Sequence, residues 1–403
     1  MYIYRVGVVG AGTMGAQIAQ VISYAGLPVV LIDVTMDKAQ QGMETVRRIY
    51  HARVERGKMT PEQAEEKMLL VSTGCDFTAL QDVDLVIEAV SENLALKRQI
   101  LHELDANCGA GAILASNTSA LSISALSAAT RRPGKLLGLH FFNPAYAMPL
   151  VEIIPGLATD PETVNDVVNF AESIRKLPIV VKECAGFLVN RLLMSYLNEA
   201  VLCVQEGAAS CKDIEQDMIA FGMPVGPFTL LDTVGLDISY DVAKILYEHY
   251  GPRMAPAALL AELVKDERFG VKNGHGFYEY EGPDTGMLDR VIEKVRQETG
   301  QRNTPWKPTR LLLAMVNEAV LALQEGVASA RDIDLAMVAG IGFPKEKEGP
   351  LHYADALGID TVLADLDAYA RTLGARFWPA PMLRRMVSAG FTGRAAGRGF
   401  FTY

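Results

Sequence analysis

Near its start the chain reads Val6-Gly7-Val8-Val9-Gly10-Ala11-Gly12-Thr13-Met14-Gly15, and an amphipathic helix is predicted to follow. The apolar run predicts a strand, and the spacing Gly-x-Gly-x-x-Gly after it is typical of a dinucleotide-binding turn. Gly10 allows the tight turn, Gly12 lets the backbone approach a pyrophosphate, and Gly15 lets the helix pack against the strand. Free N–H groups at the helix N-terminus would bind the phosphates. We therefore predict a cofactor loop formed by Gly10, Gly12, Thr13, Met14 and Gly15.

An acidic residue completes this pattern. Asp33 directly follows the second apolar run, Pro28–Ile32, at the spacing expected for a carboxylate that bonds both ribose hydroxyls. The same carboxylate would repel a 2′-phosphate, so the pattern predicts NAD rather than NADP. A plainer alternative is a tight strand–helix turn without a ligand, and the acid in place favours the dinucleotide site.

The composition indicates a globular protein of more than one domain. The chain has 403 residues, too many for one ordinary core, and 50% of them are hydrophobic. A net charge of −10 argues against nucleic acid or an anionic membrane as a partner. No apolar run reaches the length of about 18 residues that suggests a membrane span.

Cysteine and histidine usage point to a cytoplasmic protein without a metal. The five cysteines are odd in number and lack Cys-x-x-Cys spacing, so we expect reduced thiols. A strand predicted to start by Ile3 leaves no room for a signal or transit peptide. The six histidines are scattered and form no HExxH-type cluster, so we predict no metal site.

Residues 1–184 alternate short apolar runs with helical patterns, which predicts an α/β Rossmann-like domain on a parallel sheet. A helical insert is expected at about Asp37–Glu66, broken near Gly57, with a helix start at Thr60-Pro61-Glu62. The predicted strands are Tyr2–Val9, Pro28–Ile32, Met68–Ser72, Leu85–Glu88, Ile113–Ala115, Leu136–Phe141, Leu150–Ile154 and Ile179–Val181.

From Gly186 onward the strand signal disappears and an internal repeat begins. Asn198-Glu199-Ala200-Val201 returns 119 positions later as Asn317-Glu318-Ala319-Val320, and Gly274–Tyr280 returns 123 positions later as Gly397–Tyr403. The copies are too long for a solenoid unit, so they predict two duplicated all-helical domains. The predicted domains are residues 1–184, 185–282 and 283–403, with a polar linker near Glu281–Trp306.

A histidine and a carboxylate are the strongest candidates for chemistry. His140 lies at the end of an apolar run and precedes Phe141-Phe142-Asn143-Pro144, where a strand gives way to a loop. Glu152 lies within the next apolar run, where a charged residue needs a partner. A His–Glu pair supplies a base with a fixed tautomer. The alternative, which the pattern alone leaves open, is a buried histidine–acid hydrogen bond with no substrate.

Three further features each have two interpretations. Ser116-Asn117-Thr118-Ser119 follows a predicted strand, so these residues, Asn117 included, could donate to a cofactor or substrate, or could cap a helix. Asn190 lies in an apolar helix and could bond the substrate or tie the helix to the sheet. The basic residues of the insert could hold a phosphorylated ligand or form a solvated helix face. They are Arg47, Arg48, Arg53, Arg56 and Lys58.

Together these motifs resemble the L-3-hydroxyacyl-CoA dehydrogenase family over essentially the whole chain. The duplicated C-terminal domain is similar to the form in parts of multifunctional fatty-acid oxidation proteins. One departure is Pro149, which stands where the family often has Lys. The motifs that carry the resemblance are Gly10–Gly15, Asp84–Asn93, Ser116–Ser119, Gly138–Pro144 with Glu152, Gly186–Arg191 and Gly274–Tyr280.

The resemblance implies NAD-dependent oxidation of an L-3-hydroxyacyl-CoA to the 3-ketoacyl-CoA. It implies that His140 is the general base, that Glu152 is its partner, and that Ser119 and Asn190 contact the reacting end of the substrate. It also implies that the coenzyme A tail binds against the insert, at Arg56 or Lys58. The residues implied to lie near NAD are Asp33, Glu92, Lys97, Ser119, Asn143 and Lys272.

The second helical copy lacks the implied site residues. Asn190 aligns with Thr309, and Lys272 aligns with Ala395. We therefore expect one active site per chain, with the second copy as an internal dimer partner, packed through an apolar interface about a pseudo-two-fold axis. The chain would then be a monomer or a weak oligomer.

Two rival functions are weighed against this one. A β-hydroxyacid dehydrogenase of the phosphogluconate type has a similar plan but uses a Lys base, and the His140–Glu152 pair speaks against it. A non-catalytic NAD-binding structural or sensor protein would keep the fold without the activity. A complete set of His, Glu, Ser and Asn residues argues against that alternative.

Overall fold

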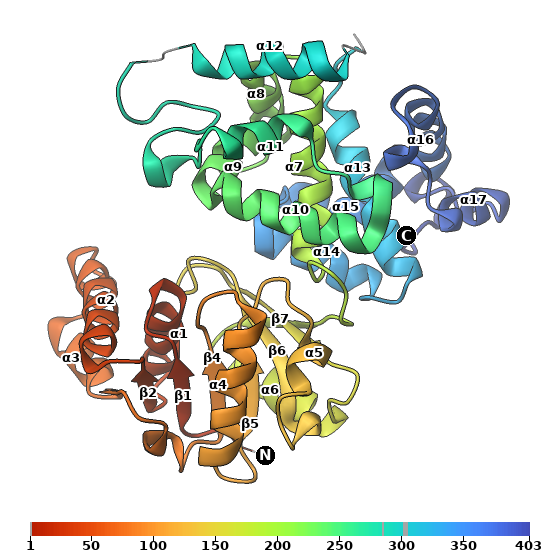
Figure 1. Cartoon of the computed structure of the whole chain (residues 1–403). Coiled ribbons are helices and arrows are strands. Elements are labelled where there is room, and N and C mark those ends of the chain that lie inside the picture. Colours follow the sequence, from red (N-terminus) through yellow and green to blue (C-terminus); the bar gives the residue numbers. More distant parts are fainter. Residues whose placement is uncertain (1, 284–285, 301–304) are drawn as a thin grey trace. The chain divides into compact units, whose positions relative to one another are not determined.

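The computed structural model describes residues 2–283, 286–300 and 305–403. It divides into two compact units, one that ends at Phe187 and one that runs from Leu188 to Tyr403. The first unit holds the sheet and the second is built from helices, each as drawn in Figure 1. No helix among the described residues is long and apolar enough to cross a lipid bilayer.

The first unit is built on one eight-stranded sheet with the order β3-β2-β1-β4-β5-β6-β7-β8. All neighbouring pairs from β3 to β6 in this order are parallel, which confirms the Rossmann-like α/β prediction. The strands are β1 (Val6–Val9), β2 (Val29–Ile32), β3 (Val71–Gly74), β4 (Leu85–Glu88), β5 (Ile113–Ser116), β6 (Leu136–Phe141), β7 (Leu150–Pro155) and β8 (Leu177–Val180).

β7 departs from the predicted parallel sheet, because it runs antiparallel to β6. The prediction is wrong here for a physical reason: only residues 142–149 join the two strands, whereas a parallel return needs a crossover of about a dozen residues or more. The antiparallel turn brings the start of β7 beside the end of β6. Both therefore lie at the edge of the sheet where β1, β2, β4 and β5 also end.

The predicted helical insert is present and broken as expected. Thr60 and Gln63 form a capping box at the start of its second helix, Pro61 occupies the first helical position, and Gly57 has a φ of 64°. That helix runs on to Met68, so the predicted strand Met68–Ser72 starts later, as β3. The helices of this unit are α1 (Thr13–Tyr24), α2 (Met36–Glu55), α3 (Pro61–Met68), α4 (Leu94–Asn107), α5 (Ile123–Ser127) and α6 (Pro161–Ser173).

The second unit contains the two helical copies, and the order of its elements repeats. The first copy has α7 (Val189–Gln205), α8 (Cys211–Phe221), α9 (Pro227–Val234), α10 (Leu236–Tyr250) and α11 (Ala258–Lys265). The second has α13 (Thr309–Gln324), α14 (Ala330–Ile341), α15 (Pro350–Leu357), α16 (Ile359–Leu373) and α17 (Pro381–Ser388).

The predicted polar linker near Glu281–Trp306 is only partly described, because residues 284–285 and 301–304 lie outside the described residues. The described part corrects the prediction, since Met287–Thr299 form helix α12. Val291, Ile292 and Val295 are buried, and α12 packs on α7 and α11 of the first copy. These apolar residues form a helical stripe that the surrounding charged residues obscure in the sequence.

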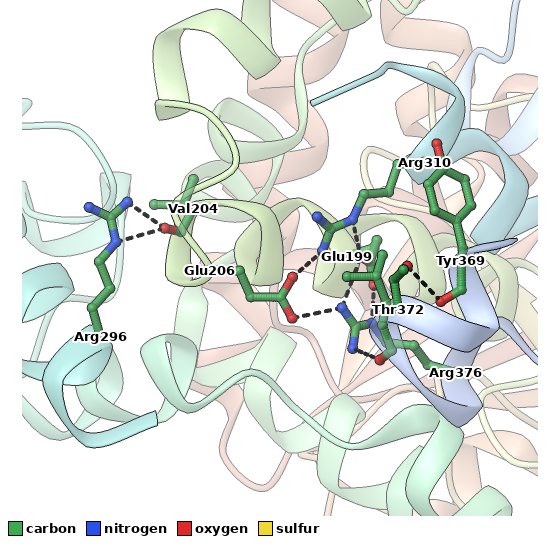
Figure 2. A network of polar contacts seen from close by, with 9 residues as sticks. Glu199, Val204, Glu206, Arg296, Arg310, Tyr369, Thr372 and Arg376 are labelled. Carbon is green, nitrogen blue, oxygen red and sulfur yellow. Dashed lines mark hydrogen bonds and ion pairs between the residues drawn. The ribbon is translucent and has the colours of Figure 1, made fainter. Parts of the chain in front are cut away.

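The two copies pack together mainly along α7 and α13. This interface is apolar, as expected from the sequence, but it also contains buried charged side chains. Arg310, at the start of α13, is fully buried and bonds Glu199 and Glu206 at the middle and end of α7. Figure 2 shows this cluster, in which Arg376 bonds the same two glutamates. The start of each helix meets the end of the other, so α7 and α13 are antiparallel.

Candidate active site

The glycine-rich loop follows β1, and its three glycines serve different purposes. Gly10 has a φ of 99°, and a Cβ there would lie 2.7 Å from the carbonyl oxygen of Ala89. A Cβ on Gly15 would lie 1.7 Å from the carbonyl oxygen of Gly10. A Cβ on Gly12 would meet no atom within 4 Å. The fold itself requires Gly10 and Gly15, whereas Gly12 faces open space that fits a ligand's pyrophosphate.

Asp33 follows β2 at the same edge of the sheet. Its two carboxylate oxygens accept hydrogen bonds from the backbone N–H groups of Ala11, at 2.8 Å, and Val34, at 2.7 Å. These bonds hold the carboxylate beside the loop. Each carboxylate oxygen can accept more than one hydrogen bond, so the carboxylate can still accept from two ribose hydroxyls.

A chain of polar contacts, buried at Glu88 and Lys97 and exposed at Glu92, supports this edge of the sheet. Glu88, the last residue of β4, is fully buried and accepts hydrogen bonds from Ser116 Oγ at 2.6 Å and Lys97 Nζ at 2.8 Å. Lys97 Nζ also lies 3.4 Å from a carboxylate oxygen of Glu92. Glu92 in turn accepts from the backbone N–H of Ser119 at 3.0 Å. The contacts connect the end of β4 to the loop that carries Ser119.

These contacts show what the hydroxyls of the loop after β5 bond to, and a contact of this loop with cofactor or substrate stays a prediction. Ser116 Oγ donates to Glu88 and Thr118 Oγ1 donates to Glu92, and Thr118 Oγ1 also accepts from the backbone N–H of Leu121 at 3.0 Å. The helix α5 is capped instead by Ser122, which lies outside the predicted motif. Lys97 has only 1% of its surface exposed and its Nζ donates to Glu88 and to the Val90 carbonyl; its place near NAD stays a prediction.

The histidine and glutamate predicted as a pair do meet. His140 and Glu152 are directly opposite each other in the β6–β7 ladder, and His140 Nδ1 lies 2.7 Å from Glu152 Oε2. Both side chains are buried, Glu152 completely. The imidazole also contacts the rings of Phe142 and Phe187, with centroids 4.5 Å and 5.8 Å away. An ionised Glu152 would fix the hydrogen on Nδ1 and leave Nε2 as the basic nitrogen.

Two amides tie the loops around His140 together. The Asn117 side-chain oxygen accepts from the backbone N–H of Phe141 at 2.8 Å, which links the end of β5 to the end of β6. Gln17 of α1 donates to Asn143 Oδ1 at 3.3 Å and accepts from the N–H of Ala145 at 2.6 Å. The helix of the glycine-rich loop is therefore joined directly to the loop after His140.

A lysine holds the same loop from the other side. Lys176 Nζ donates to the backbone carbonyls of Ala145 and Met148, the latter at 2.7 Å. Burial lowers the pKa of Lys176 to about 8. Pro149, the departure from the family pattern, accepts from the N–H of Leu177 at 2.8 Å, so it closes this loop onto β8.

The basic insert and the glycine-rich loop share a cavity of about 830 Å³. Gly12 and Thr13 line it from one side and Arg56 and Lys58 from the other. Arg47 instead pairs with Glu44 at 2.8 Å. Among the basic residues of the insert, Arg48, Arg53, Arg56 and Lys58 line this cavity, whereas Arg47 does not. The remaining lining residues are Ala11, Gln17, Gln41, Thr45, Ile49, Ala52, Tyr146 and Ala147.

Two predicted site residues belong to the second unit. Asn190 is the second residue of α7, and Lys272 forms an ion pair with Asp237 at the start of α10. Among the described residues, no three His, Cys, Asp or Glu side chains gather as a metal site would require.

The motif search missed Gln17, Glu88 and Lys176. Gln17 and Glu88 carried a usable signal, because a polar residue on the buried face of a helix or within an apolar strand needs a partner. Lys176 carried none, since its partners are backbone carbonyls far along the chain.

Comparison with known families gives matches along most of the chain. Residues 5–184 match the model of the 3-hydroxyacyl-CoA dehydrogenase NAD-binding domain. Residues 186–280 and 308–403 both match the model of the 3-hydroxyacyl-CoA dehydrogenase C-terminal domain. The duplication predicted from the repeat is thereby confirmed.

Relatives and solved structures agree with these matches. The fatty acid oxidation complex subunit alpha of Shewanella frigidimarina is 39% identical over 96% of this chain and 55% of its own length, so the chain spans about half of that relative. A 3-hydroxybutyryl-CoA dehydrogenase structure from Escherichia coli covers 96% of this chain and 99% of its own, at 28% identity and a TM-score of 0.87. An (S)-3-hydroxybutyryl-CoA dehydrogenase from Ralstonia eutropha covers 70% of this chain and 100% of its own, at 39% identity and a TM-score of 0.68.

Proposed function

The chain belongs to the 3-hydroxyacyl-CoA dehydrogenase family, and from this premise we propose that it oxidises an L-3-hydroxyacyl-CoA to the 3-ketoacyl-CoA with NAD. The single observation that carries the proposal is the buried His140–Glu152 pair, with Nδ1 and Oε2 2.7 Å apart at the carboxyl edge of the sheet. In open α/β sheets that edge is the usual place for a ligand crevice.

The chemistry assigned to the chain is a proton transfer. His140 Nε2 takes the proton of the substrate 3-hydroxyl, and Glu152 stabilises the imidazolium that forms. NAD, when bound, would supply the acceptor for the hydride that leaves carbon 3, the carbon that bears this hydroxyl. Ser119 and Asn190 are proposed to position the oxygen, by analogy with the family. The carboxylate of Asp33 is proposed to favour NAD over NADP, which the ratio of kcat/KM for the two cofactors tests.

The basic insert is proposed to bind the coenzyme A phosphates. Its support is the cavity that Arg56 and Lys58 line, since guanidinium and ammonium groups are common phosphate ligands. Removing either charge should raise KM for acyl-CoA substrates and leave KM for truncated thioesters unchanged. An equal effect on KM for both substrate types would favour the alternative, in which the basic residues of the insert form a solvated helix face.

The decisive test substitutes the pair itself. His140→Gln and Glu152→Gln should each lower kcat, because losing a general base costs on the order of 10² to 10⁴ in rate. NAD affinity, measured by equilibrium titration, should change little, since neither side chain belongs to the glycine-rich loop. Near-normal kcat in either variant would leave the pair as a structural hydrogen bond.

A further inference from the structure

The first turn of α7 is held by residues of the second helical copy. Arg191 has no exposed surface, and its Nε donates to Glu318 Oε1 at 2.6 Å. Its two terminal nitrogens bond both carboxylate oxygens of Glu325, at 2.7 Å and 3.1 Å. The guanidinium carbon also lies 4.4 Å from the centre of the Tyr250 ring. Bidentate pairs of this kind fix the position and the plane of a guanidinium.

This anchor sits next to the residue proposed to contact the substrate. Asn190 immediately precedes Arg191, and α7 begins one residue earlier, at Val189. Gly186 and Phe187 have positive φ values of 71° and 51°, so α7 starts from a turn and does not continue an earlier helix. The first turn of a helix lacks half of the backbone bonds that hold its interior, so a side-chain anchor there has a large influence on its position.

The equivalent half of the interface, in which the two copies exchange roles, has the same chemistry but no proposed site residue beside it. Arg310 lies 119 positions after Arg191 and bonds Glu199 and Glu206, which lie 119 positions before Glu318 and Glu325 (Figure 2). The residue before Arg310 is Thr309, where the first copy has Asn190. The chain therefore contains two near-identical arginine anchors, only one of which adjoins a candidate substrate contact.

We propose that Glu318 and Glu325 are positioning residues for Asn190, so that the second helical copy completes the substrate-binding end of α7. The inference rests on the proposed function, because it requires Asn190 to contact the substrate. It assigns the second copy a part in substrate binding in addition to covering an interface. Glu199 and Glu206 perform the same structural task for Arg310 at the start of α13. Glu199 lies nine residues after Asn190 in α7, roughly 14 Å along the helix.

The experiment compares two double variants of the full chain, Glu318→Gln with Glu325→Gln, and Glu199→Gln with Glu206→Gln. Both remove two negative charges that pair with a buried arginine of the same interface, so both should lower Tm; Glu325 is 41% exposed, whereas the other three glutamates are buried. Steady-state kinetics with 3-hydroxybutyryl-CoA and NAD, well below either Tm, should show kcat/KM reduced about tenfold or more in the first variant only. The KM for NAD should stay within about twofold of the unmodified chain in both.

Three outcomes overturn the inference. Equal losses of kcat/KM in the two double variants would show that both arginine anchors are merely structural. No loss of kcat/KM in the Glu318→Gln, Glu325→Gln variant would show that these glutamates do not position Asn190. If a double variant fails to fold, the single variants Glu325→Gln and Glu206→Gln are compared instead, since each leaves one glutamate bonded to its arginine. The loss of kcat/KM must then appear in Glu325→Gln and not in Glu206→Gln. An inactive unmodified chain would instead overturn the proposed function, and this inference with it.

Discussion

The two helical copies share the residues of their common interface but differ at the positions proposed to serve the substrate and cofactor. Both keep the buried arginine at the start of their first helix, and both keep the two glutamates that pair with the other copy's arginine. Asn190 becomes Thr309 and Lys272 becomes Ala395. Both copies therefore keep the residues that hold the interface together, whereas only the first copy keeps the residues proposed to serve the site.

A second shared device lies inside each copy. Asp232 accepts hydrogen bonds from two backbone N–H groups and a tyrosine hydroxyl of the tail Phe277–Tyr280. Asp355 makes the same three bonds to the tail Phe400–Tyr403. Only the first copy has a lysine just before this tail, at Lys272. Folding devices and site residues are therefore separable by comparing the copies.

Deleting the second copy, Trp306–Tyr403, is expected to have the largest effect and tests whether that copy is an internal partner of the first. The truncated chain would expose the face of α7 and leave the buried Arg191 without its carboxylates, which is costly for a charge in the interior. We expect aggregation, instability or dimerisation, measured by light scattering after size exclusion. A truncated chain that stays monomeric, soluble and fully active would refute the idea of an internal partner.

A milder test exchanges one residue in each copy. Asn190→Ala should lower kcat/KM on the order of 10 to 10², the usual cost of losing a hydrogen bond to a group that carries charge. Thr309→Ala should leave kcat/KM within about twofold, because no substrate contact is proposed there. The kinetics should be accompanied by NAD titration, which is expected to saturate at one per chain. Comparable losses in the two variants, or two NAD per chain, would contradict a single site.

The aspartates of the two tails provide a test in which the copies should behave alike. Asp232→Asn and Asp355→Asn should each lower the free energy of unfolding by about 1 to 3 kcal/mol, since each replaces one of two acceptor oxygens with an NH2 group that cannot accept from the buried donors. Urea unfolding of both variants measures this. Only Asp232→Asn should raise KM for NAD, through the nearby Lys272. A stability loss in one variant alone would show that the copies do not share this device.

The smallest expected effect is a pH dependence that belongs to the second copy. Burial raises the pKa of Asp334 to about 6, although His352 Nδ1 lies 2.6 Å away. The folded state therefore favours the protonated form, so this contribution to stability is present below about pH 4 and is lost as the pH rises toward 6. Between those values, Tm should fall less, or rise more, in Asp334→Asn than in the unmodified chain. Parallel Tm curves would contradict the assignment.

Much of the α/β unit could be predicted because its signals are local. The loop at Gly10–Gly15, Asp33 and the capped helix start at Thr60 each occupy a short stretch with a known geometric requirement. The duplication was equally accessible, because it needs only a comparison of the chain with itself.

What could not be predicted depends on partners far away in the sequence. No periodicity indicates that Arg191 meets Glu325, 134 positions later, or that Lys176 binds two backbone carbonyls. The direction of β7 depended on the length of one loop, and α12 was hidden among charged residues. The contacts of Arg191 and Lys176 are properties of packing, which local sequence does not specify, whereas the length of the loop before β7 can be read from the sequence.

The pairing of His140 with Glu152 across two strands has a consequence for how the enzyme comes into being. Side chains along a strand alternate between faces, so a slip of one residue between β6 and β7 would point the imidazole and the carboxylate away from each other. A chain can collapse, form its helices and bury its apolar residues while the proposed base, His140, still lacks its partner Glu152. Recovery of activity during refolding would therefore report on the alignment of one strand pair, a later and more stringent event than compaction.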